Sequence, residues 1–133
     1  MNVGLDTSVV LRLLVGQPAD QAQRAVEFLE SVARRGDRVV VADLVVAEAY
    51  FALHYHYAVP KKDALAALRK MFADGEIGST GVAADVLTSE GATLASVKPG
   101  FVHRLIQGAY IASGGSMATF EKASGKLKSV QVL

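Results

Sequence analysis

The sequence predicts one α/β domain with three layers, in which helices cover both faces of a mostly parallel sheet. Short β-branched apolar runs alternate along the chain with longer segments of helical apolar spacing. The chain has 133 residues, the size of one ordinary domain, and no repeat, linker or low-complexity tract divides it. Because alternating strands and helices favour parallel pairing through helical connections, we expect a single domain over residues 1–133.

The predicted strands are short. The clearest is the run RVVVA at residues 38–42, because β-branched side chains pack well on a pleated sheet. The other predicted strands cover residues 3–5, 77–80, 117–120 and 130–133. Parallel strands end at one edge of their sheet, and ligands bind beyond that edge. Polar residues that follow a strand are therefore candidates for function.

The predicted helices fill the segments between the strands. Pro18 begins one helix at a first-turn position, and Gly36 ends it. Gly91 weakens a later helical pattern, and the pair Gly114 and Gly115 ends the last one. The predicted helices cover residues 7–15, 18–35, 43–57, 60–73, 83–96 and 101–112.

Composition excludes several classes of protein. The chain has no cysteine, so disulfides and thiolate metal sites are excluded. No apolar run approaches the roughly 18 residues of a membrane span, and the first residues lack the pattern of a signal peptide. We therefore expect a cytoplasmic protein that does not enter a membrane.

Charge is segregated along the chain. Residues 1–90 carry nine Lys/Arg and twelve Asp/Glu, whereas residues 91–133 carry five Lys/Arg and one Glu. A segregated positive charge is typical of a face that binds phosphate, although an imbalance on a solvated surface has the same pattern.

Three carboxylates are candidate metal ligands, and two of them follow a predicted strand. Asp6 follows the first strand and Glu121 follows the strand at residues 117–120, so both are candidate ligands of a divalent metal ion. Each has a structural alternative, because Asp6 also suits a helix N-cap and Glu121 the first turn of a helix.

Glu48 interrupts an apolar stripe on the predicted helix 43–57. The other members of the stripe are Leu44, Val45, Phe51, Ala52 and Tyr55. A carboxylate buried on such a face is costly unless it is paired or binds a metal. The alternatives are a buried ion pair or a position at the edge of the stripe. Oxygen ligands alone suit Mg²⁺ or Mn²⁺, so Asp6, Glu48 and Glu121 together predict a site for one of these ions.

Four segments resemble the PIN-domain ribonucleases, including the VapC-type toxins. They are GLDTSVVLRLL, VVADLVVAEAYFAL, PGFVHRLIQGAY and SMATFEKASGKL, and their order and spacing also match the family. The resemblance implies a PIN-like fold, an Mg²⁺- or Mn²⁺-dependent endoribonuclease, and the toxin of a toxin–antitoxin pair. It also implies an RNA substrate, an antitoxin protein as partner and a homodimer.

The resemblance assigns catalytic positions to Asp6, Glu48, His103 and Glu121. The family has Asp where this chain has His103, and usually Asp where it has Glu121. Imidazole is a poor ligand for Mg²⁺ and a better one for Mn²⁺ or Zn²⁺. His103 can therefore be read as a metal ligand, a phosphate contact, a mark of lost activity or a plain surface histidine.

Other polar residues have supporting roles in the same comparison, each with an ordinary alternative in capping or on the surface. Thr7 and Ser8 are placed to bond Asp6 or a metal-bound water, and Thr119 to support Glu121. The candidates for phosphate contact are Lys98, Arg104 and Lys122.

Four aromatic residues lie close together in the predicted helix 43–57. Tyr50, Phe51, Tyr55 and Tyr57 are expected to be mostly core and to reach a subunit interface, where Tyr is enriched.

The alternative function is a degenerate, non-catalytic PIN-like module that binds RNA or a protein partner. A phosphatase or other α/β enzyme is weaker, because the chain has no phosphate-binding glycine loop and no nucleophile elbow.

Overall fold

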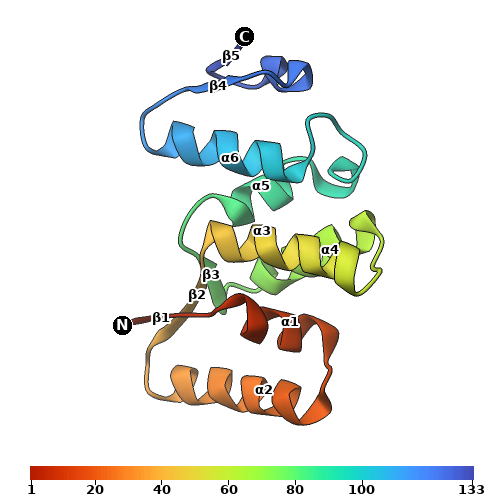
Figure 1. The fold of residues 1–133 in the computed structure, drawn as a ribbon. Helices are drawn as coiled ribbons and strands as arrows, with labels where there is room; N and C mark the ends of the chain where they lie inside the picture. The colour runs from red at the N-terminus through yellow and green to blue at the C-terminus, as the bar shows by residue number, and fades with distance from the viewer.

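The computed structural model describes residues 1–133 as an α/β chain with two small parallel sheets (Figure 1). Its strands are β1 (Asn2–Gly4), β2 (Arg38–Val41), β3 (Ile77–Ser79), β4 (Met117–Thr119) and β5 (Val130–Val132). Its helices are α1 (Thr7–Val15), α2 (Ala19–Arg34), α3 (Asp43–Phe51), α4 (Lys61–Ala73), α5 (Ala83–Ser89) and α6 (Phe101–Ala112). A π-helical turn extends α3 over Ala52–His56, and short 3-10 turns cover Gly91–Thr93 and Lys122–Lys126.

The first sheet has the strand order β1-β2-β3, and both of its pairs are parallel. Val3 is opposite Val39, and Val39 is opposite Ile77. The second sheet contains only β4 and β5, also in parallel. We call residues 117–133, which hold β4, the Lys122–Lys126 turn and β5, the C-terminal unit. In Figure 1 this unit lies beyond α6, and α3, α5 and α6 lie between it and β1.

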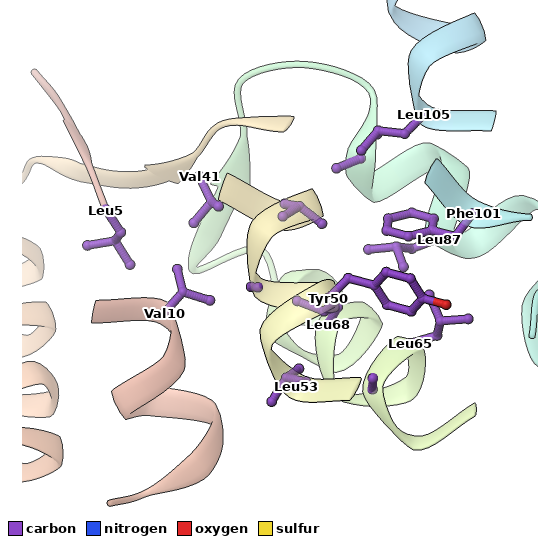
Figure 2. Packing of buried hydrophobic residues seen from close by; sticks show 14 of the residues in the cluster. Leu5, Val10, Val41, Tyr50, Leu53, Leu65, Leu68, Leu87, Phe101 and Leu105 are labelled. Carbon is purple, nitrogen blue, oxygen red and sulfur yellow. The ribbon is translucent and has the colours of Figure 1, made fainter. Parts of the chain in front are cut away.

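One hydrophobic cluster joins the first sheet to all six α-helices. Figure 2 shows how side chains from separate elements meet there. Tyr50 of α3 packs edge-on against Phe101 of α6, with ring centroids 5.3 Å apart. Burial, followed by the charge of Tyr55, raises the pKa of Tyr50 above its ordinary value of 10.0. The labelled members of the cluster are Leu5, Val10, Val41, Tyr50, Leu53, Leu65, Leu68, Leu87, Phe101 and Leu105.

The bounds of most elements agree with the sequence prediction. The helices at residues 7–15 and 101–112 end as predicted, and the five strands lie where they were expected. The helix predicted at 83–96 ends earlier, at Ser89, because Gly91 takes a left-handed conformation with φ of 53°. Parallel pairing is confirmed, but the strands form two sheets instead of one because β4 lies beyond α6.

The expectation that the aromatic cluster is mostly core is wrong for three of its four members. Tyr50 is buried, but Phe51 is 44% exposed and Tyr55 is 71% exposed, and Tyr57 is also on the surface. The reason is the orientation of α3, which turns Val46, Ala49 and Tyr50 toward the core and leaves the adjacent stripe in solvent. No helix is long and apolar enough to cross a membrane.

Asp43 connects the start of α3 to the start of α5. Its Oδ1 accepts hydrogen bonds from the backbone N–H groups of Val82 and Ala83, each at 3.0 Å. Gly81 leaves room for this carboxylate, since a Cβ at that position would lie 2.2 Å from Asp43 Oδ2. The connection fixes α5 beside the carboxyl end of β2.

We expect Asp43→Ala to lower the free energy of unfolding by about 1–3 kcal/mol, because two part-buried N–H groups lose a charged acceptor. Urea denaturation measures this change. Asp20→Ala is the matched control, since Asp20 also lies in the first turn of a helix and its side chain accepts no hydrogen bond there. Equal losses in the two variants would contradict the role of Asp43.

A second anchored carboxylate lies before β2. Asp37 accepts a hydrogen bond from Arg35 Nε at 2.7 Å and another from the amino group of Met1 at 3.0 Å. The Arg35 bond first, and the Met1 amino group second, hold the pKa of Asp37 below its ordinary value of 3.8.

We expect Asp37→Asn to destabilise the protein at neutral pH and to have no effect in strong acid. Because the folded pKa is lowered, the carboxylate stabilises the fold above its ordinary pKa, and this contribution is lost as pH falls through the folded pKa. Denaturant curves for the two chains should converge only below about pH 4. A difference that stays constant down to about pH 2 would contradict this reading.

Candidate metal centre in two half-sites

Asp6 and Glu48 come together through Thr7 at the carboxyl end of the first sheet. The backbone N–H of Thr7 donates to Asp6 Oδ1 at 2.8 Å, and the Thr7 hydroxyl donates to Glu48 Oε1 at 2.9 Å. Asp6 lies just beyond β1, whereas Glu48 lies on α3, which follows β2. We call Asp6, Thr7 and Glu48 the N-terminal half-site.

Local structure explains the position of each member. Asp6 has extended backbone angles and is the N-cap of α1, so the capping alternative holds for one of its oxygens. Thr7 bonds Asp6 through its backbone N–H, which is the capping alternative, because its hydroxyl reaches Glu48 instead.

The expectation that Glu48 lies on a buried face is wrong. Glu48 is exposed, and Leu44, four residues earlier on the same face, is 73% exposed. The side of α3 that enters the core carries Val46, Ala49 and Tyr50. Glu48 therefore has contact with water, and no ion pair neutralises it.

His103 and Glu121 line a second hollow, of about 230 Å³, with Lys98 and Pro99. His103 is in the first turn of α6, and Glu121 follows β4. The Thr119 hydroxyl accepts the backbone N–H of Glu121 at 3.0 Å, so Thr119 bonds the backbone of Glu121 and not its carboxylate. Glu121 Oε1 in turn accepts the N–H of Ala123 at 3.4 Å and begins a 3-10 turn. We call His103 and Glu121 the C-terminal half-site.

The structure does not bring Asp6, Glu48 and Glu121 to one place. No group of three or more His, Asp or Glu side chains lies close enough to hold a metal ion together. The separation follows from the topology, because β4 pairs with β5 beyond α6 and not with β1 (Figure 1). The two half-sites thus divide the four predicted residues into pairs.

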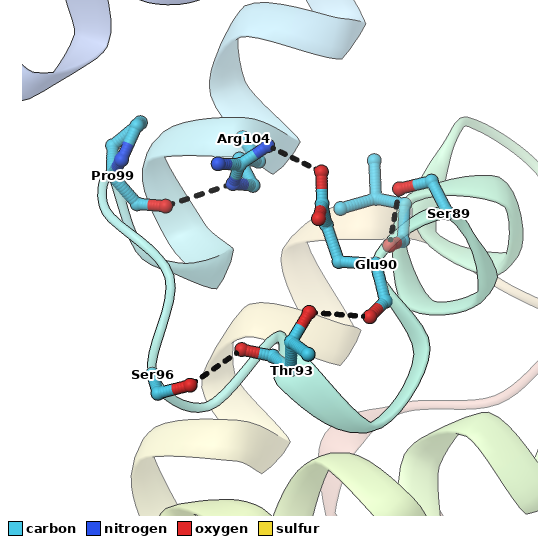
Figure 3. Close-up of polar contacts among 7 residues, drawn as sticks. Ser89, Glu90, Thr93, Ser96, Pro99 and Arg104 are labelled. Carbon is cyan, nitrogen blue, oxygen red and sulfur yellow. Dashed lines mark hydrogen bonds and ion pairs between the residues drawn. The ribbon is translucent and has the colours of Figure 1, made fainter.

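Arg104 is not available as a phosphate contact. Its Nε donates to the carbonyl oxygen of Pro99 at 2.8 Å, and its Nη1 pairs with Glu90 at 3.1 Å (Figure 3). Its side chain is only 12% exposed. Arg104 instead holds the loop before α6 against the end of α5. Lys98 and Lys122 remain exposed.

Sequence reasoning missed two cations near the N-terminal half-site. Arg12 and Arg24 line a groove between α1 and α2, together with Ser8 and Gln21. Arg12 Nε donates to Gln21 Oε1 and ties the two helices together. The detectable signal was the spacing of Ser8 and Arg12, which puts them on one face of a helix that also begins with Thr7.

The N-terminal half-site offers donors that suit Mg²⁺ or Mn²⁺. Both carboxylates supply hard oxygen ligands. Mg²⁺ in proteins is commonly held by one or two carboxylates, with waters and substrate phosphates in the other coordination positions. Asp6 Oδ2 and Glu48 Oε2 accept no hydrogen bond from the protein, so both have free lone pairs. The C-terminal half-site has one carboxylate and one imidazole, a set better suited to Mn²⁺ or Zn²⁺ than to Mg²⁺.

Comparison of the chain with models of protein families, with curated proteins and with solved structures gave no match.

We expect Arg104→Met to lower the free energy of unfolding by about 1–3 kcal/mol, because Glu90 and the Pro99 carbonyl lose their donor. Thermal or urea unfolding measures the loss. Lys122→Met is the control, since Lys122 is exposed and forms no ion pair. A neutral Arg104→Met variant with weakened RNA binding would restore the phosphate-contact interpretation.

Proposed function

We propose that this chain is a metal-dependent endoribonuclease with a PIN-like fold and acts as the toxin of a toxin–antitoxin pair. The observation that carries the proposal is the Thr7 link between Asp6 and Glu48, two carboxylates from segments 41 residues apart in the chain. They lie at the carboxyl end of a parallel sheet, where α/β proteins bind ligands. The four segments that resemble the family support the same function.

Each residue has a role that follows from its chemistry. Asp6 and Glu48 would hold Mg²⁺ or Mn²⁺, which when bound activates water and stabilises charge on a phosphoryl group. Thr7 orients Glu48 through its hydroxyl and fixes Asp6 through its backbone N–H. Glu121 belongs to the same site in this proposal, although in one chain it lies with His103.

The RNA backbone would follow the groove beside α1. Arg12 and Arg24 line that groove and supply positive charge next to the helix that carries Thr7. A cytoplasmic location, an antitoxin partner and a homodimer belong to the same proposal, because the family resemblance implies them.

A second function is a non-catalytic PIN-like module that binds RNA or a protein partner. The favouring observation is the division of the four expected residues into two half-sites, together with His103 at a position where the family has Asp. A chain that never assembles its acids would keep the fold and the basic surface without cutting.

We expect Thr7→Val to weaken Mn²⁺ binding about 10- to 100-fold, as the loss of a residue that orients a metal ligand does in other proteins. Isothermal titration with Mn²⁺ measures the affinity. Thr7→Ser is the matched control, because it keeps the hydroxyl that reaches Glu48.

We expect Glu48→Gln to abolish Mn²⁺-dependent cleavage of RNA by the partner-free protein.

The two proposed functions predict different results for Mn²⁺ binding and RNA cleavage. Cleavage that survives Glu48→Gln, or native protein that neither binds Mn²⁺ nor cuts RNA, would contradict the nuclease. If the native chain is inactive and His103→Asp gains metal-dependent cleavage, the non-catalytic module is supported.

A further inference from the structure

The two sheets of the chain both have open edges. β1 pairs only with β2, and β4 pairs only with β5. Asn2 and Gly4 of β1 and Ala118 of β4 are exposed. Backbone groups along an unpaired edge favour pairing with another strand. Since all five strands lie in parallel pairs, β4 added in parallel to β1 would put Glu121 at the same sheet edge as Asp6.

Each half-site also has an exposed apolar side chain beside its acid. Leu44, one turn before Glu48, is 73% exposed, and Phe120, directly before Glu121, is 81% exposed. Burial of either side chain in an interface would be favourable, because it removes apolar surface from water. Contact between the two half-sites would cover both.

The total surface is larger than a closed domain of this size requires. The accessible surface is 7712 Å². A monomer of 14.0 kDa is expected to expose about 6,700 Å². The excess of about 1,000 Å² is comparable with the roughly 800 Å² that each partner buries in a standard protein interface.

The charges of the two regions are complementary. Residues 1–90, which hold the N-terminal half-site, carry three more acids than bases. The C-terminal unit carries Lys122, Lys126 and Lys128 against Glu121 alone. Opposite net charge favours association of the two regions over association of two like-charged regions.

We propose that two copies of this chain bind reciprocally through their C-terminal units, an arrangement that we call the exchange. β4 of one copy adds in parallel to the free edge of β1 of the other, and Glu121 of the copy that donates β4 completes the other copy's site of Asp6 and Glu48. The C-terminal unit stays docked on its own α6, where Gln107 Nε2 donates to the Lys128 carbonyl at 2.9 Å. The role of the completed site rests on the proposed nuclease function, whereas the exchange itself does not.

Cross-linking tests the exchange without any measurement of activity. The native chain has no cysteine, so Gly4→Cys and Ala118→Cys introduce unique reactive groups on β1 and β4. A Cβ at Gly4 meets no atom within 4 Å, so that variant should fold. The two variants carry tags of different size, are refolded together and are treated with a short bis-maleimide reagent.

We expect a covalent dimer that contains one chain of each variant. Ala118→Cys paired with Glu27→Cys is the control and should not cross-link, because Glu27 lies on α2, outside β1 and both half-sites. Two outcomes would overturn the exchange. One is a native chain that remains monomeric by light scattering at high concentration. The other is a double variant, Gly4→Cys with Ala118→Cys, that cross-links only within one chain.

Complementation tests the shared site. In an exchanged dimer of one Glu48→Gln chain and one Glu121→Gln chain, one site has lost both acids and the other keeps Asp6, Glu48 and Glu121. We expect each variant alone to lose Mn²⁺ binding by calorimetry and cleavage of RNA, and an equal mixture to regain about a quarter of each, because half of the dimers are mixed and each has one intact site. Circular dichroism melting checks that both variants fold.

The cross-linking and complementation results together distinguish failure of the exchange from failure of the nuclease function. Heterodimer cross-links without Mn²⁺ binding or cleavage in native protein would leave the exchange standing and overturn the nuclease. Native cleavage without recovery in the mixture would leave the nuclease standing and overturn the shared site.

Discussion

The packing of α3 determines where the acids of the first sheet lie. One side of this helix meets α1, α4 and α6 through Val46, Ala49 and Tyr50, and the edge-on contact of Tyr50 with Phe101 fixes its rotation. Full burial of a side chain of the size of Val46 contributes about 1.5–3 kcal/mol. With that side in the core, Glu48 must point to solvent beside the start of α1, where the Thr7 hydroxyl reaches it.

The same rotation leaves an apolar stripe in water. Leu44, Phe51 and Tyr55 flank Glu48 on the exposed side of α3. A folded monomer tolerates scattered exposed apolar residues, but neighbouring ones such as Phe51 and Tyr55, whose stacked rings have centroids 6.2 Å apart, are typical of an interaction surface.

The elements could be predicted because their signals are local. Proline and glycine set the ends of α2, and the run of valines sets β2, so neither depends on distant contacts. The face of Glu48 could not be predicted, because Leu44, Val45 and Phe51 are as apolar as Val46, Ala49 and Tyr50, and α3 has almost no amphipathic contrast. Only tertiary packing decides between two such faces.

The pairing of strands that are distant in the chain also could not be predicted from the sequence. The strand ends of β1 and β4 indicated that Asp6 and Glu121 share an edge, but the rule assumes one sheet, and this chain forms two. Arg104 likewise resembled a surface base until the loop at Pro99 and the end of α5 enclosed it. In both cases the deciding contacts join segments that no local pattern connects.

The hydroxyl of Thr7 has a single proton, and that proton is directed to Glu48. Whatever enters the space beside this hydroxyl therefore meets oxygen lone pairs from Thr7 and from both carboxylates, with no donor among them. Such a surface repels a bare phosphate and attracts a positive ion. An anionic polymer can approach this corner of the fold only with a cation between itself and the protein.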